Sequence, residues 1–182
     1  MATGYVRLGE MLVREGLLTR DELERVITAK RKSNARLGEL VVALGLAEES
    51  AVASCLAHQY GMPLADLDNI SIQQEAIDVM PGFHAVSRLV LPVSIDDQEF
   101  HCVISDPLDI GLTDELSVLF KRRVVASVAA PSALHNKIVR VYGLSLNERD
   151  SARKSKPTKN SGDDRAELLF AIDQLHDFID RT

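Results

Sequence analysis

Apolar residues in the first 60 positions recur at the spacing of amphipathic helices, and the same pattern is written twice. The segment 7–30 returns as 36–59, at a constant offset of 29 residues. Both copies open with Arg-Leu-Gly-Glu, and both reach Gly-Leu nine residues after the arginine. Each glycine is typical of a helix end, so each copy is predicted to form two helices. A repeat this short cannot bury its own apolar face, so we expect the two copies to pack against each other as a small four-helix bundle.

The pattern changes after Pro63, where short apolar runs alternate with helical segments. We expect helices at 73–80, 114–121 and 132–142, and strands at 89–95, 100–105 and 124–130. Pro81 and Gly82 are expected to end the first of these helices. The fold class predicted for the whole chain is α+β: tandem helical hairpins followed by a small α/β subdomain with a three-stranded sheet.

The C-terminal part of the sequence is divided in two by composition. Residues 146–162 are polar and basic without periodicity, which indicates a flexible linker. Residues 163–182 carry two basic and six acidic side chains, and their apolar stripe predicts an amphipathic helix. The domains are therefore expected at 1–62 (tandem repeats, ligand binding), 63–145 (α/β subdomain), 146–162 (linker) and 163–182 (C-terminal helix). We expect the helix at 164–181 to pack on the body or to bind a protein partner, and we favour the partner.

Composition excludes several function classes. The formal net charge is −6, Trp is absent and aromatic residues make up 4% of the chain, which argues against a DNA or RNA binder. No apolar run is long enough to cross a membrane, and no signal peptide is recognised, so we expect a cytoplasmic protein without membrane insertion. Cys55 and Cys102 lie in apolar runs without metal-ligand spacing and are expected to be reduced core thiols.

The repeated arginine and glycine are the strongest candidates for binding chemistry. An arginine can stack on a purine, or bind guanine or phosphate through its two-pronged guanidinium group. A glycine two residues later allows the backbone to approach a ligand closely. The alternative is that Arg-Leu-Gly only starts a helix at a tight packing corner. Two copies of a polar arginine in register favour the binding interpretation.

These residues resemble a known family. Arg-Leu-Gly, an apolar pair, Gly-Leu and apolar residues on the next helix are written twice, with the five-residue spacer 31–35 and a final glutamine in the second copy. This pattern is similar to the MshEN domain. That domain is the N-terminal part of type II secretion and type IV pilus assembly ATPases, and many members bind cyclic di-GMP. The resemblance extends over about residues 5–145, because Gly61-Met-Pro63, Leu91-Pro92-Val93, Ser105-Asp106-Pro107 and Tyr142-Gly143 match later landmarks.

The resemblance implies a set of ligand contacts, with one guanine half of the dinucleotide on each motif. The implied contacts are Arg7, Leu8, Gly9, Leu23, Ile27 and Lys30 in the first repeat, and Arg36, Leu37, Gly38, Val52, Leu56 and Gln59 in the second. Lys30 stands where the family usually has glutamine, and Ala47 replaces a larger apolar residue.

The resemblance also sets the functional expectation: a bacterial cyclic di-GMP receptor or adaptor in signal transduction, acting on a secretion, pilus or motility partner. The phosphate-loop pattern GxxxxGK[ST] of the parent ATPases does not occur, so we expect the domain to act here without the ATPase. Two alternatives remain: a ligand-free protein–protein docking module of such a system, and, with less support, an ATP-binding module.

Other chemistry receives little support from the sequence. The five histidines are scattered without metal spacing, and no nucleophile–base pair is recognised. We therefore expect no enzyme activity, no catalytic residue, no metal and no cofactor. The run Lys121-Arg122-Arg123 indicates a solvated helix end, with a docking patch as the open alternative.

Overall fold

The computed structural model describes residues 7–144 and confirms the predicted α+β class. The predicted linker at 146–162 and the predicted helix at 163–182 lie outside the described residues. The described part forms two compact units, residues 7–52 and residues 53–144, and the division falls after Val52, inside the last helix of the second repeat. The sequence places a boundary after residue 62 instead, ten residues further along.

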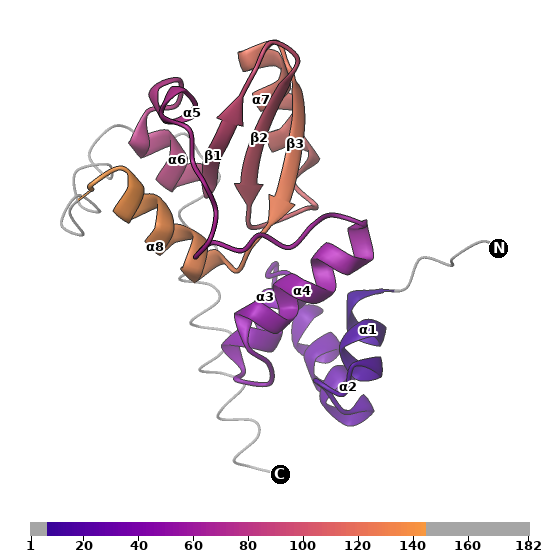
Figure 1. Cartoon of the computed structure of the whole chain (residues 1–182). Helices are drawn as coiled ribbons and strands as arrows, with labels where there is room; N and C mark the ends of the chain where they lie inside the picture. Colours follow the sequence, from indigo (N-terminus) through magenta and orange to yellow (C-terminus); the bar gives the residue numbers. More distant parts are fainter. Residues whose placement is uncertain (1–6, 145–182) are drawn as a thin grey trace. The chain divides into compact units, whose positions relative to one another are not determined.

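The two repeats form the predicted helical hairpins (Figure 1). Their helices are α1 (Leu8–Arg14), α2 (Arg20–Lys30), α3 (Leu37–Ala43) and α4 (Glu49–Tyr60). Within the first unit, α1 packs against α2 and α3, and α2 packs against α3. The buried apolar residues of this unit are Met11, Leu12, Leu18, Val26, Ala29, Ala35, Leu40, Val41 and Val52. Burial of this shared apolar face is what holds such short helices in place.

Local hydrogen bonds end the first helix of each repeat in the same way. Gly16 and Gly45 both have positive φ angles, +73° and +67°. The Gly16 and Leu17 amides donate to the carbonyls of Val13 and Leu12, and the equivalent amides of the second repeat donate to Val42 and Val41. This is the Schellman arrangement, in which a left-handed residue lets two amides satisfy the last free carbonyls of the helix.

A capping box begins α2, as the sequence predicts. The Glu22 amide donates to the Thr19 hydroxyl oxygen at 3.2 Å, and the Thr19 amide donates to the Glu22 carboxylate at 2.7 Å. The Thr19 amide and the Thr19 hydroxyl both donate to the Glu22 carboxylate, and these two bonds lower the pKa of Glu22 because they stabilise its ionised form. The helix therefore starts at a position set by its own sequence.

The second unit is built on a three-stranded sheet in the order β1-β2-β3. The strands are β1 (Val90–Ile95), β2 (Glu99–Ile104) and β3 (Arg123–Val128). β1 and β2 form an antiparallel hairpin with an irregularity between Pro92 and Ser94, and β2 pairs with β3 in parallel. Three strands were predicted within one or two residues of these bounds, because β-branched runs alternate with clear turn residues.

Four helices accompany the sheet, one more than predicted. They are α5 (Gln74–Asp78), α6 (Gly82–Arg88), α7 (Ile110–Phe120) and α8 (Pro131–Val141). Helices α5, α6 and α8 pack against β1, and α7 packs against β3 (Figure 1). The prediction missed α6 because Pro81 and Gly82 were interpreted as terminators, whereas Pro81 occupies the N-cap position and Gly82 is the first helical residue.

The core of this unit lies between the sheet and its helices. Phe100 is fully buried and stacks on Phe120, with ring centroids 4.4 Å apart. Cys102 is buried, and burial raises the pKa of its thiol to about 12. Cys55 is buried as well, so both cysteines lie in the core as the sequence predicts. Within residues 7–144, no helix is long and apolar enough to cross a membrane.

Candidate functional site

The two repeated arginines occupy equivalent positions, each immediately before a short helix. Arg7 precedes α1 with φ −66° and ψ 145°, and Arg36 precedes α3 with φ −74° and ψ 152°. The carbonyl of each arginine accepts the first helical amide bond, from Met11 and from Leu40, at 3.1 Å in both cases. Both residues are exposed. The backbone therefore has the same extended conformation at both arginines, and the two side chains leave it at equivalent positions of the repeat.

The two repeated glycines are contacts between helices. A Cβ added to Gly9 would lie 2.6 Å from Cδ1 of Leu23, and one added to Gly38 would lie 2.9 Å from Cγ1 of Val52. Leu23 and Val52 are themselves equivalent positions of the repeat. The sequence suggested that glycine leaves room for a ligand, and in the structure that room holds a side chain of the same repeat. The packing interpretation therefore accounts for both glycines.

One leucine links the two repeats. Cδ2 of Leu8 lies 3.5 Å from the position that a Cβ on Gly38 would occupy. The structure thus brings together five of the predicted site residues in the first unit: Leu8, Gly9, Leu23, Gly38 and Val52. All five take part in apolar contacts near the starts of α1 and α3, the two helices that follow Arg7 and Arg36. This cluster holds in place the two helices that begin directly after the arginines.

The remaining first-repeat candidates lie further along α2. Ile27 is 39% exposed, which is high for an isoleucine and leaves an apolar surface one turn after Leu23. Lys30 ends the helix, and its ammonium donates to the carbonyl of Ala35 at 3.2 Å. Ala35 directly precedes Arg36. Lys30 therefore holds the spacer that leads into the second arginine.

The second-repeat candidates follow the same spacing on α4. Val52, Leu56 and Gln59 are separated by four and three residues, so they share one side of the helix. Leu56 and Gln59 belong to the second unit. The Oε1 atom of Gln59 is buried and has no hydrogen-bond partner in the structure, so it is an acceptor that a bound N–H group could satisfy. Leu37 is half-buried at the start of α3.

The chemistry offered by these residues is that of binding. Guanidinium groups, one ammonium and exposed apolar side chains can hold a flat, anionic ligand. Among the described residues 7–144, no group of three His, Cys, Asp or Glu side chains could hold a metal ion.

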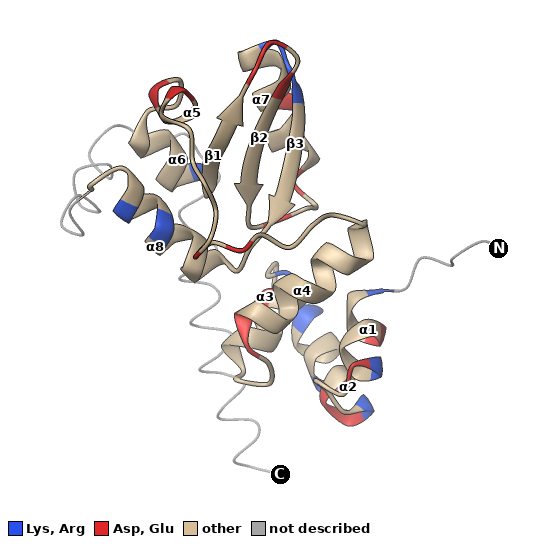
Figure 2. Ribbon diagram, viewed as in Figure 1, with Lys and Arg blue, Asp and Glu red and all other residues tan. Residues whose placement is uncertain are grey.

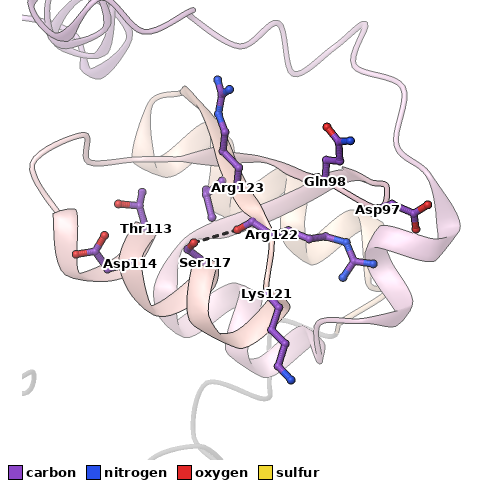
Figure 3. A pocket seen from close by; sticks show the side chains of 9 residues that line it. Asp97, Gln98, Thr113, Asp114, Ser117, Lys121, Arg122 and Arg123 are labelled. Atoms are coloured by element: carbon purple, nitrogen blue, oxygen red, sulfur yellow. Dashed lines mark hydrogen bonds between the residues drawn. The ribbon is translucent and has the colours of Figure 1, made fainter.

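A second feature lies in the other unit, and the sequence pointed to it only through its basic run. A hollow of about 740 Å³ is lined by Asp97, Gln98, Thr113, Asp114, Ser117, Lys121, Arg122, Arg123 and Val124 (Figure 3). It lies where α7 ends and β3 begins, beside the β1–β2 turn. The Ser117 hydroxyl donates to the Arg122 carbonyl at 3.0 Å and closes the α7–β3 turn. Backbone amides of Glu99 and Gln98 lower the pKa of Asp96 in the neighbouring turn.

Comparison with known proteins identifies relatives of this chain. Residues 60–148 match the family model of the MshEN domain. The type IV pilus assembly ATPase PilB of Myxococcus xanthus is 31% identical over 136 residues, which cover 75% of this chain. PilB of Thermus thermophilus is 28% identical over 121 residues, or 65% of this chain. The matched regions are 24% and 14% of those two proteins, so the chain corresponds to a quarter or less of each.

Solved structures share the fold. A structure described as MshE with cdg superposes with a TM-score of 0.66 at 26% identity, covering 75% of this chain and 99% of that one. The N-terminal domain of XpsE has a TM-score of 0.61 at 22% identity, covering 74% and 92%, and this shows the fold alone. The family model begins at residue 60, after the repeats. The Myxococcus match covers more of the chain than residues 60–182 contain, so it extends into the repeats.

Proposed function

Because this chain carries an MshEN domain, we propose that it is a receptor for cyclic di-GMP. The two repeats bind the dinucleotide, and the bound state is passed to a protein partner of a pilus, secretion or motility system. The protein binds and signals and is not an enzyme.

One observation carries the proposal: the MshE structure with cdg matches this chain over 99% of its own length. We interpret cdg as cyclic di-GMP. The equivalent backbone geometry at Arg7 and Arg36 supports the same ligand, because two matched corners suit a molecule made of two equal halves. Neither observation depends on the other.

The proposed roles follow from where the residues lie. Arg7 and Arg36 bind guanine or phosphate through their guanidinium groups. Leu23 and Ile27 in one repeat, and Leu56 in the other, give an apolar surface to the bases, while the buried Val52 packs beside Gly38. Gln59 supplies an unpaired acceptor and Lys30 a positive charge. The Leu-Gly pairs at 8–9 and 37–38 hold the helices that present these groups.

The output element in this proposal is the C-terminal segment 164–181, which contacts the protein partner. We place the protein in the cytoplasm, where the nucleotide and assembly ATPases are expected to meet. Removal of residues 147–182 then leaves nucleotide affinity nearly intact and abolishes capture of the partner.

Isothermal titration calorimetry of the purified chain with cyclic di-GMP tests the receptor function. ATP and GTP serve as controls. ATP tests the ATP-binding alternative, and GTP tests whether a single guanine nucleotide is enough for binding. Saturable binding of cyclic di-GMP at micromolar concentration, without comparable heat from ATP or GTP, supports the proposal. An absence of saturable binding at tens of micromolar overturns it.

A second function is favoured by the glycine contacts. Since Leu23 and Val52 fill the space beside Gly9 and Gly38, the repeats are also consistent with a scaffold that docks a protein without nucleotide. Under that alternative, a partner of the assembly system is captured equally with and without cyclic di-GMP. Under the receptor proposal, capture changes when the nucleotide is added.

A further inference from the structure

Helix α7 has an outward face that is unusually apolar for a surface helix. Val118 and Leu119, three and four residues after Glu115 and therefore on the same side of the helix, are 78% and 65% exposed. Leu108 and Ile110, at the start of the helix, are also exposed. The opposite side of α7 buries Leu112 and Leu116 in the core. The helix therefore carries large apolar side chains on a second side, in addition to the side that packs Leu112 and Leu116 into the core of the second unit. Several large apolar side chains exposed on one helix mark a binding surface more often than a single one does.

Positive charge gathers at the C-terminal end of this face. Lys121, Arg122 and Arg123 follow α7 directly, and Figure 2 shows basic residues at this end of the unit beside the acidic β1–β2 turn. Arg122 is committed to the fold, because its guanidinium donates to the carbonyls of Asp96 and Phe120. Arg123 pairs with Glu99 at 3.5 Å, but its side chain is 77% exposed, so this surface ion pair contributes little and can be shared.

The basic side chains do not converge on one point. In Figure 3, Lys121 and Arg123 extend in opposite directions from the α7–β3 turn. A site for a small anion requires donors aimed at one position. Two diverging cations beside an apolar helix instead fit an extended partner that contacts both.

One of the two acidic residues of α7 is paired with a cation of another helix. Glu115 is paired with Arg88 of α6, so its charge is already balanced. Asp114 directly precedes Glu115 and lies about two turns before Lys121. The face thus consists of Val118 and Leu119, with the cations Lys121 and Arg123 following at the C-terminal end of the helix.

We propose that this face of α7 is a docking site for an acidic amphipathic helix of a partner protein. The partner's apolar stripe packs on Val118 and Leu119, and its carboxylates pair with Lys121 and Arg123. Packing two helices through one apolar stripe each is a common mode of helix recognition. The site is separate from the two repeats and does not depend on cyclic di-GMP.

The test uses the full chain and a defined probe. The probe is a fluorescein-labelled peptide of roughly 18 residues, long enough for a bound helix, with leucine at every third or fourth position and mostly glutamate elsewhere. A second peptide carries lysine in place of each glutamate. Fluorescence anisotropy is measured with the parent chain, Val118→Asp, Lys121→Glu plus Arg123→Glu, and the control Phe83→Asp. Phe83 is 62% exposed on α6, so the control alters an equally exposed apolar residue elsewhere.

The expected result is saturable binding of the acidic peptide to the parent chain and to Phe83→Asp. Val118→Asp and Lys121→Glu plus Arg123→Glu are each expected to weaken binding by about tenfold or more, as loss of an interface anchor or reversal of a charge pair does. All variants alter exposed residues, and circular dichroism checks that each one is folded. Equal binding of the lysine peptide, or equal binding by the α7 variants, overturns the proposal.

One further variant separates a partner from the chain's own C-terminal segment. Residues 164–181 are also acidic, with apolar positions that include Leu168 and Ile172. If the parent chain fails to bind the acidic peptide and Leu168→Asp plus Ile172→Asp binds it, the face belongs to that segment, and the assignment to a partner protein is wrong. If neither chain binds the peptide, the face is not a docking site for such a helix.

Discussion

The Val52 side chain fills the space that a side chain on Gly38 would need. A Cβ at position 38 would approach Cγ1 of Val52 to 2.9 Å, closer than non-bonded carbon atoms normally come. The equivalent pair in the first repeat is Gly9 and Leu23. The two pairs show that the 29-residue repeat is a repeat of packing as well as of sequence.

Gly38→Ala is predicted to destabilise the protein more than Gly9→Ala does. Val52 is buried and β-branched, so it moves with difficulty, whereas Leu23 is only half-buried and can turn aside. Overpacking costs about 1–3 kcal/mol, against about 1 kcal/mol gained by replacing glycine with alanine in a helix. Urea denaturation of both variants measures the difference. In a Val52→Ala background, Gly38→Ala should become neutral or stabilising, and an unchanged loss there would show that Val52 is not the cause.

Gly16→Ala and Gly45→Ala should each lower the free energy of unfolding by about 1–2 kcal/mol, the cost of a left-handed conformation for a residue with a Cβ. Nothing lies within 4 Å of a Cβ at either position, so backbone strain is the whole effect and the two losses should be similar. Gly111→Ala is the control, because Gly111 lies inside α7 without a positive φ. Thermal denaturation that shows the same loss at Gly111 would contradict this explanation.

Lys30→Met is predicted to loosen the spacer that leads into Arg36. The Lys30 ammonium donates to the Ala35 carbonyl, and a hydrogen bond from a charged group contributes about 1.5–3 kcal/mol. Hydrogen exchange should accelerate at the amides of residues 31–36. Arg25→Met removes one charge from the same helix and should leave those amides unchanged. Equal acceleration in both variants would assign the effect to charge alone.

Tyr142 is predicted to make stability depend on pH in the alkaline range. Its hydroxyl donates to the Met80 carbonyl at 2.9 Å, and burial raises its pKa to about 12 from an ordinary value near 10. The unfolded chain loses the proton first as the pH rises, so the stabilisation is complete below about pH 10 and declines towards pH 12. Tyr142→Phe should remove this part of the decline and cost about 0.5–1.5 kcal/mol at neutral pH. Denaturation of Tyr60→Phe as a function of pH should retain the decline, and its loss there would assign the effect elsewhere.

Local signals made most of the fold predictable. The capping box at Thr19 and Glu22, and the glycines at 16 and 45, depend on neighbouring residues, so their helix boundaries follow from sequence alone. Helix α6 was missed for a tertiary reason: a Cβ on Gly82 would lie 2.9 Å from Cδ1 of Tyr142, a contact 60 residues away in the chain. Helix α7 starts at Ile110 instead of 114, because the Asp109 carboxylate accepts the Leu112 amide and caps it. That aspartate was a usable signal.

The sequence predicted which residues make up the candidate site better than it predicted what each residue does. The repeat identifies Arg7 and Arg36 because a polar residue is kept in register where packing does not require it. The same repeat could not reveal that Gly9 and Gly38 face side chains of their own repeat, since that depends on how two helices meet. Nor could it reveal that the Lys30 ammonium donates to the Ala35 carbonyl.

The most direct test of the account is a calorimetric titration of cyclic di-GMP into three proteins: the parent chain, Arg7→Ala plus Arg36→Ala, and the control Arg14→Ala plus Arg20→Ala. The control removes the same amount of charge from two exposed arginines whose equivalent positions in the second repeat hold other residues. The account predicts equal micromolar binding by parent and control. The Arg7 and Arg36 variant should bind at least about 100-fold more weakly, since each charged hydrogen bond contributes about 1.5–3 kcal/mol. Equal affinity in all three proteins, or no binding by the parent chain, would contradict it.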